Sequence, residues 1–267
     1  MISAKINRKN YKQKQMLLDT DKILVAGATG GVGQLVVAKL LAKELQVRGL
    51  TRNKAKAESM FAGKVELVEG DIRYPDTLGE AVKDINYLIC CTGTTAFPST
   101  KWDFANLFQA SNSPEAVDGQ GVKNLVSAAP KDLKRFVFVS SCGVLRKDRL
   151  PFNILNAFGV LDAKLMGEKA IAASGLPYTI IRPGRLIDGP YTSYDLNTLL
   201  RAKTDGKKAV VMQTGDDLNG DTSRVDVANA CVESLFYDTT INKDFSIVNE
   251  GQRPRNTNWE RLFASLA

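Results

Sequence analysis

The stretch that decides the fold is ILVAGATGGVGQLVV, at residues 23–37. An apolar run typical of a buried strand passes directly into a GxxGxxG motif at Gly27, Gly30 and Gly33, and then into an amphipathic segment. In such a turn the first glycine permits the sharp bend, the second lets the backbone approach a diphosphate, and the third allows close helix packing. N–H groups at the helix start can then hold phosphate oxygens. The motif predicts a dinucleotide-binding turn made of Gly27, Ala28, Thr29, Gly30, Gly31, Val32 and Gly33.

Short apolar runs alternate with amphipathic segments along the chain, which is the pattern of parallel strands joined by crossover helices. The expected strands cover residues 23–27, 46–52, 65–70, 86–93, 135–141 and 177–184. The expected helices cover residues 31–43, 53–61, 75–83, 118–129 and 153–174. The prediction is an α/β fold with a doubly wound, mostly parallel sheet of the Rossmann type.

The sequence is less regular towards its end. Residues 185–267 are expected to form a small, irregular C-terminal part, in which 210–212 and 245–249 are strands and 225–237 and 257–266 are helices. No repeat or linker divides residues 21–267, so we expect them to form one Rossmann-type domain preceded by a basic arm at residues 1–20.

Charge is concentrated at the beginning of the chain. The net charge is +7, and residues 1–18 contain five Lys or Arg and no acid, which leaves about +2 for the rest. A nucleic-acid-binding surface is therefore not expected. The arm is either solvated or contacts an anionic partner or lipid surface. No apolar run reaches about 18 residues, and no signal or transit peptide is evident, so we expect a soluble protein that is not integral to a membrane.

Several kinds of chemistry are disfavoured by composition. The chain has no histidine, which removes Ser/His/Asp triads and the commonest metal ligand. Its four cysteines lack CxxC spacing, and Cys142 is interpreted as a packing residue. Asp216, Asp217 and Asp221 lack EF-hand spacing and are expected in a solvated turn. We therefore predict no metal site.

The end of the second expected strand indicates the cofactor. An acid there holds the ribose hydroxyls of NAD, whereas a base accepts the additional phosphate of NADP. Residues 46–57 contain no acid but carry Arg52, Lys54 and Lys56. NADP is favoured over NAD, with Arg52 as the phosphate ligand. The alternative is that these are solvated charges at a helix start.

Four segments resemble those of atypical short-chain dehydrogenases/reductases: GATGGVG at 27–33, VRGLTR at 47–52, GDIRYPDTL at 70–78 and IIRPG at 180–184. The resemblance covers about residues 22–250 and is strongest, through residues 150–184, to the NAD(P)H-binding, NmrA-like proteins of cyanobacteria and plastids. It implies a location in a cyanobacterial cytosol or a plastid stroma.

The resemblance also implies roles for individual residues. Residues at the ends of the third and fourth strands would contact the adenine and the cofactor ribose, and those are Asp71, Ile72, Thr92 and Gly93. Later positions would surround the nicotinamide, its ribose and the substrate carbonyl, and those are Ser140, Ser141, Lys164, Pro183 and Gly184. Ser141 and Lys164 are the candidate catalytic residues, because the family's serine polarises the carbonyl and its lysine lowers the pKa of a tyrosine.

That tyrosine is missing. In the family it stands four residues before the lysine, and this position is Val160. Tyr178 is interpreted as structural, whereas Tyr191 and Tyr194 are the candidate substitutes. Lys164 and Glu168 are spaced i, i+4, so they could also simply pair on one helix. A long polar stretch at 94–117 contains Trp102 and Phe104, which would either cap the nicotinamide pocket or fill an apolar gap.

Two functions from different classes follow. The first is a reductase that moves hydride from NADPH to a small carbonyl, quinone or other conjugated acceptor. The second is a non-catalytic protein in which bound NADP(H) reports redox state or supports assembly of a partner. An isomerase or epimerase is a weaker third hypothesis, because it generally needs the missing base.

Overall fold

The computed structural model describes residues 17–94, 112–188, 196–201 and 208–266. Most of the basic arm lies outside the described residues, as do Trp102, Phe104, Tyr191 and Tyr194, together with most of the 94–117 stretch.

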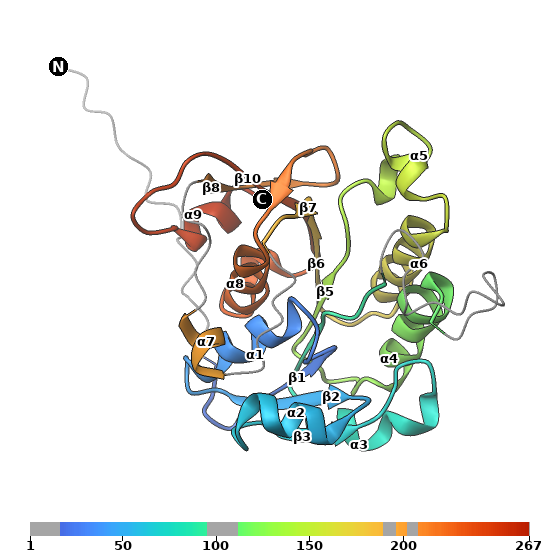
Figure 1. Cartoon of the computed structure of the whole chain (residues 1–267), viewed down its shortest axis with the longest axis vertical. Helices are drawn as coiled ribbons and strands as arrows, with labels where there is room; N and C mark the ends of the chain where they lie inside the picture. The colour runs from blue at the N-terminus through green and yellow to red at the C-terminus, as the bar shows by residue number, and fades with distance from the viewer. Residues whose placement is uncertain (1–16, 95–111, 189–195, 202–207, 267) are drawn as a thin grey trace.

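The described residues form a sheet of eight strands in the order β3-β2-β1-β4-β5-β6-β10-β8 (Figure 1). Its members are β1 (Lys22–Ala26), β2 (Gln46–Thr51), β3 (Glu66–Glu69), β4 (Tyr87–Cys90), β5 (Arg135–Val139), β6 (Tyr178–Pro183), β8 (Lys208–Thr214) and β10 (Lys243–Gln252). All neighbours are parallel except β8, which is antiparallel to β10. The strand order reverses between β1 and β4, which is where open α/β sheets bind ligands. The predicted doubly wound, mostly parallel sheet is confirmed.

Helices lie on both faces of this sheet (Figure 1). They are α1 (Gly33–Leu41), α2 (Lys54–Phe61), α3 (Gly79–Val82), α4 (Val122–Ala128), α5 (Phe152–Leu155), α6 (Val160–Ala173), α7 (Leu196–Arg201), α8 (Arg224–Ser234) and α9 (Trp259–Ala264). A π-helix, η3 (Glu115–Gly121), precedes α4, and there are short 3-10 helices at η1 (Pro75–Thr77), η4 (Val144–Arg146) and η5 (Asp238–Thr240). The two-residue strands β7 (Arg185–Leu186) and β9 (Asp221–Thr222) pair with each other. None of the helices in the described residues is long and apolar enough to span a bilayer.

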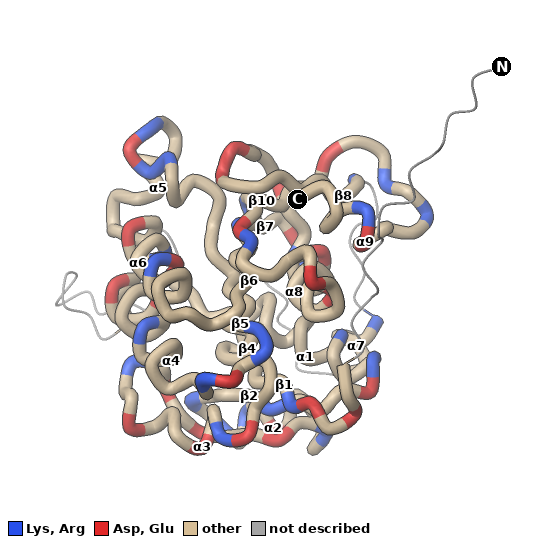
Figure 2. The backbone as a smooth tube through the Cα atoms, turned by 180° about the vertical axis from the view of Figure 1, so that it is seen from behind, with Lys and Arg blue, Asp and Glu red and all other residues tan. Residues whose placement is uncertain are grey.

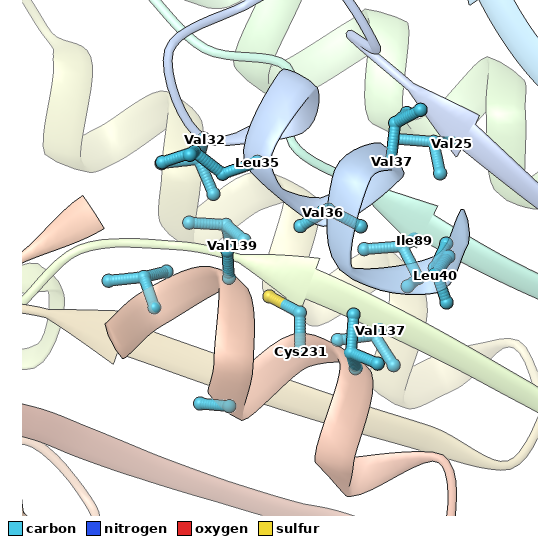
Figure 3. Close-up of a cluster of buried hydrophobic side chains, with 14 of the residues drawn as sticks. Val25, Val32, Leu35, Val36, Val37, Leu40, Ile89, Val137, Val139 and Cys231 are labelled. Atoms are coloured by element: carbon cyan, nitrogen blue, oxygen red, sulfur yellow. The ribbon is translucent and has the colours of Figure 1, made fainter. Parts of the chain in front are cut away.

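Alternating residues of β1 explain how both faces are held. Ile23 and Val25 belong to one buried apolar cluster, which also contains residues of α1 and α8, such as Val36 and Cys231 (Figure 3). Leu24 and Ala26 point to the opposite face and belong to a second cluster with residues of α3 and α4. Because both faces of β1 are covered, the strand is held in a fixed position, and so is the glycine-rich turn that follows its last residue.

One expectation about these elements is wrong, and another is extended by the structure. The strand expected at 245–249 falls within β10, which pairs in parallel with β6 and so continues the sheet beyond the strand at 177–184, with Phe245 beside Ile181. The helix expected over 153–174 is divided into α5 and α6, because Gly159 between them has a φ of 74°. The side chain of Asn156 then accepts the N–H groups of Leu161 and Asp162 at 2.9 and 3.1 Å, which caps the start of α6.

Among the described residues, positions of acidic and basic residues alternate along the backbone in the view of Figure 2.

Candidate functional site

The glycine-rich turn is as tight as its sequence predicts. Gly27 has a φ of 78°, a conformation that favours glycine. Its carbonyl oxygen accepts the N–H of Gly30 at 2.9 Å, and a Cβ added to Gly33 would lie 2.0 Å from the same oxygen. No larger residue fits at position 33 without moving α1 away from β1.

The start of α1 leaves its first amides available. The helix has no side-chain cap at Val32. Within the described part of the chain, the N–H groups of Gly31, Val32 and Gly33 form no hydrogen bond. Unpaired N–H groups and the positive end of the helix dipole make such a turn an anion-binding site.

A cavity of about 400 Å³ opens beside this turn, at the carboxyl ends of β1, β2, β3 and β4. Its lining includes eight of the predicted site residues, namely Gly27, Thr29, Gly30, Arg52, Asp71, Ile72, Thr92 and Gly93. It also includes Lys56, Arg73, Thr94 and Asn112. We call this space the cationic cavity, because Arg52, Lys56 and Arg73 all line it. Its volume is within the range of pockets that hold small molecules and cofactors.

Two of the cations that line the cationic cavity form hydrogen bonds with neighbouring side chains. Nη1 of Arg52 donates to the side-chain oxygen of Asn112 at 3.1 Å. Arg73 binds both carboxylate oxygens of Asp71, with contacts of 2.5 to 3.0 Å. Burial disfavours the Asp71 carboxylate, but these hydrogen bonds outweigh it and hold the pKa of Asp71 below its ordinary value. Asp71 is therefore an ionised partner of Arg73 at neutral pH.

Lys164 lies behind the cationic cavity rather than in its lining. Its Nζ is 2.8 Å from Oδ1 of Asp118, 3.1 Å from the carbonyl oxygen of Val139 and 3.3 Å from that of Thr92. Lys164 is 7% exposed and Asp118 is fully buried. The other oxygen of Asp118 accepts the N–H and hydroxyl of Thr94 at 2.9 and 2.6 Å. Three oxygen atoms of the protein thus surround the ammonium group.

Glu168 is not the partner of Lys164, so the alternative that these two residues simply pair on one helix is wrong. Its carboxylate binds the guanidinium of Arg182 at 2.8 and 3.0 Å, and its Oε1 accepts the hydroxyl of Ser140 at 2.5 Å. Arg182 also pairs with Asp244. The geometry of β6 decides this outcome, because Arg182 points towards α6 from the sheet. We call Lys164, Asp118, Glu168, Arg182 and Ser140 the buried ionic cluster.

Other predicted residues lie near these groups but outside the lining of the cationic cavity. Ser141 follows β5, and its hydroxyl donates to the carbonyl of Cys142 at 3.1 Å. Pro183 is buried, and Gly184 is packed so closely that an added Cβ would lie 2.2 Å from the carbonyl oxygen of Gly220. The remaining turn residues, Ala28, Gly31, Val32 and Gly33, lie along the start of α1 and not on the cavity wall.

The position of the missing tyrosine is apolar in three dimensions as well. Val160 begins α6, one turn before Lys164, and is buried against Val144 and Leu161. Tyr178 packs against the second apolar cluster, which agrees with its interpretation as a structural residue.

The structure agrees with the interpretation of Cys142 as a packing residue, but the solvated turn expected at Asp216 is wrong. The thiol of Cys142 is buried, which raises its pKa to about 11, and it contacts the carbonyl of Arg182 at 3.1 Å. These features suit a packing residue. Asp216 is not in a solvated turn, because it is 3% exposed and accepts the N–H groups of Gly143 and Leu145 at 2.7 and 2.8 Å. It holds the loop after β5 in place.

Two residues of the site, Asp118 and Arg73, were not predicted from the sequence. Asp118 lies in η3, a π-helix whose register could not be read from periodicity. Arg73 stands two residues after Asp71 in the GDIR segment, and a search for side chains that could neutralise Asp71 would have found it.

Comparisons with known proteins agree with this geometry. A family model described as NAD(P)H-binding matches residues 27–238. An uncharacterized chloroplastic protein of Arabidopsis thaliana is 34% identical in an alignment of 259 positions, which covers 92% of this chain and 83% of that protein. Sanguinarine reductase of Eschscholzia californica is 31% identical in an alignment of 272 positions, which covers 91% of this chain and 95% of that protein.

A solved structure extends the likeness to the fold. The oxidoreductase ylbE from Lactococcus lactis matches with a TM-score of 0.66 at 22% identity, over 92% of this chain and 96% of that one. The chain therefore belongs to the NAD(P)H-binding, NmrA-like family of atypical short-chain dehydrogenases/reductases.

Proposed function

We propose that the protein binds NADP(H) and is a reductase of a small carbonyl, quinone or other conjugated acceptor. The observation that carries the proposal is the turn at residues 27–33, whose unpaired amides adjoin the cationic cavity. The residues that would hold the diphosphate are those of the turn, and Thr92, Gly93, Asp71 and Ile72 would border the adenosine portion. When bound, NADPH supplies the hydride.

The choice of NADP over NAD is supported by the charge of the cavity wall. Arg52, Lys56 and Arg73 contribute three cations, whereas the one acid among the lining residues, Asp71, is paired with Arg73. A carboxylate engaged in this way is a poor partner for ribose hydroxyls, and cations favour a phosphate. Arg52 is exposed and extends from the end of β2, so we assign the additional phosphate to it.

The type of acceptor is supported by what is missing beside Lys164. Val160 provides no proton donor, and the Lys164 ammonium is enclosed by Asp118 and two carbonyl oxygens. A quinone or conjugated ring needs less help from a protein acid than a simple ketone does. The segment after Ser141 also exposes large apolar side chains suited to such a ring, namely Leu145, Leu150, Ile154, Leu155 and Phe158. The likeness to sanguinarine reductase further supports a reductase.

The second candidate is an NADP(H)-binding sensor or assembly protein without turnover. The observation that favours it is the same enclosed lysine, because a residue with its charge matched inside the protein is poorly placed to activate a substrate. The chloroplastic relative supports a plastid location for either function, and a cyanobacterial cytosol is the alternative.

A binding titration followed by a turnover assay tests both candidates. NADPH is titrated against the purified full chain by fluorescence, and oxidation of NADPH is then followed at its nicotinamide absorbance with quinones, aldehydes and flavins as acceptors. We expect saturable binding and turnover with at least one quinone or flavin. Turnover that survives Ser141→Ala and Lys164→Met would contradict their catalytic assignment. Binding without any turnover supports the sensor, and no binding overturns both functions.

A further inference from the structure

One glycine of the turn is not explained by the GxxGxxG motif. Gly31 lies between the second and third motif glycines and has no positive φ. A Cβ added to it would meet the side chain of Arg224, at 3.2 Å from Nε and 3.5 Å from Cδ. The first distance is tighter than ordinary van der Waals contact, and the second is an ordinary contact. A small residue at position 31 therefore allows an arginine from a distant part of the sequence to lie directly against the turn.

Arg224 is held in this position from its backbone outwards. It is the first residue of α8, a helix that packs beside α1 (Figure 1). The carboxylate of Asp188 accepts the N–H of Arg224 and the hydroxyl of Ser223, both at 2.5 Å. Nη1 of Arg224 donates to the carbonyl oxygen of Asp188 at 2.7 Å. The side chain is 17% exposed, so part of it remains accessible to solvent.

The guanidinium keeps unused hydrogen-bonding capacity. Among the described residues, Nε and Nη2 of Arg224 form no hydrogen bond. The N–H groups of Gly31, Val32 and Gly33 are similarly unpaired, and they belong to the segment against which Arg224 packs. Asp188 offsets part of the arginine's charge, and it contacts the guanidinium through Nη1. Two sets of donors, from α1 and from α8, thus meet at one place.

We propose that Arg224 is a further binding residue for the diphosphate of the dinucleotide, with its guanidinium and the amides of residues 31–33 holding the phosphate oxygens from two sides. The inference rests on the proposed NADP(H) binding and assigns to it a residue outside the glycine motif. A diphosphate is the ligand that fits, because a guanidinium matches paired phosphate oxygens and helix amides bind a single anionic centre. Gly31 is then required because it leaves room for the arginine.

The test compares two ligands that share the 2′-phosphate but differ in the diphosphate. NADPH and adenosine 2′-monophosphate are titrated by calorimetry into the wild type, Arg224→Ala, Arg224→Lys, Arg52→Gln and the control Arg255→Ala, which changes an exposed arginine before α9. We expect Arg224→Ala to weaken NADPH binding about tenfold to a hundredfold, the usual effect of losing charge-assisted hydrogen bonds. It should leave the affinity for adenosine 2′-monophosphate unchanged, and Arg224→Lys should restore part of the loss. Arg52→Gln should weaken both ligands.

Several outcomes overturn the inference. Equal NADPH affinity in Arg224→Ala and Arg255→Ala does so while leaving the proposed function intact. Equal losses for both ligands in Arg224→Ala, with a lowered Tm of the ligand-free protein, show a structural role instead. A wild type that binds neither ligand overturns the proposed function itself.

Gly31→Ala provides a second test that keeps the guanidinium. In the otherwise wild-type chain, Gly31→Ala should weaken NADPH binding because the new Cβ displaces the side chain of Arg224. In the Arg224→Ala background, the same substitution should lower the NADPH affinity much less. Additive losses would contradict the inference.

Discussion

The cationic cavity and the buried ionic cluster lie on the two sides of Gly93, yet they treat charge in opposite ways. In the cavity, Arg52 is exposed and donates a hydrogen bond to a neutral residue, Asn112. In the cluster, Lys164 and Arg182 are buried, and each is paired with a carboxylate at 2.8 Å. An added Cβ on Gly93 would lie 3.1 Å from Nζ of Lys164, so the two regions are separated by little more than one backbone segment.

Under the proposed function, this difference would separate cofactor binding from catalysis. Exposed cations remain available to an anionic ligand at modest desolvation cost, whereas buried cations with matched carboxylates contribute mainly to the position of the elements that carry them. A chain of this design can retain its nucleotide while its proton-transfer machinery is altered. Four predictions test that separation, beginning with the largest expected effect.

Gly33→Ala should damage the binding turn most. The new Cβ would lie 2.0 Å from the carbonyl oxygen of Gly27, so α1 must move away from β1. We expect a loss of about 3 kcal/mol in the free energy of unfolding and NADPH binding too weak to measure. Gly79→Ala is the matched control, because a Cβ there meets no atom within 4 Å. Denaturant unfolding and fluorescence titration with NADPH are measured for both variants. Equal stability and equal NADPH affinity of Gly33→Ala and Gly79→Ala would contradict the tight packing of Gly33 against Gly27.

Glu168→Gln should affect stability and spare binding. It removes one of the two carboxylate charges paired with the buried guanidinium of Arg182, the other being that of Asp244, and we expect the free energy of unfolding to fall by about 3 kcal/mol. NADPH affinity of the folded variant should stay within about twofold of the wild type. A large loss of affinity without a loss of stability would place the buried ionic cluster in the binding site after all.

Arg52→Gln should discriminate between the two dinucleotides. We expect the dissociation constant for NADPH to rise about tenfold to a hundredfold, because a charge-assisted contact with the 2′-phosphate is lost, while that for NADH hardly changes. Lys54→Gln is the control, because this neighbouring cation is exposed but does not line the cavity. Equal effects of Arg52→Gln on both nucleotides would refute the assignment.

The pair of Arg73 with Asp71 should produce the smallest effect, visible as a pH dependence. The pKa of Asp71 is lowered in the folded state, so the pair stabilises the protein above about pH 4 and loses this contribution as the pH falls through the lowered pKa. Arg73→Gln should cost about 1 kcal/mol at pH 7 and progressively less towards pH 3. Denaturant unfolding at several pH values measures the difference, and a cost independent of pH would show that the pair is unimportant.

The local sequence pattern was sufficient to predict the strands and helices of the first half of the fold and the glycine-rich turn. The run from Ile23 to Gly33 combines a strand, three glycines and a helix start, and each of these signals depends on neighbours in the sequence. The helix over 153–174 was predicted wrongly because a single glycine, Gly159, adopts a left-handed conformation that apolar periodicity does not register. The basic residues after β2, Arg52, Lys54 and Lys56, could be recognised in the sequence because they follow the strand within a few residues.

Long-range packing decided the rest. Asp118 rather than Glu168 became the partner of Lys164, because η3 and α6 pack together while Arg182 reaches Glu168 from β6. Arg224 reached Gly31 across almost two hundred positions of sequence, since α8 packs beside α1. Sequence by itself therefore determined the strands, the glycine turn and the sign of charge around it, which depend on short-range backbone preferences. Which charges are neutralised and which face the turn was decided by the tertiary structure, because pairing depends on distances between elements that the sequence keeps far apart.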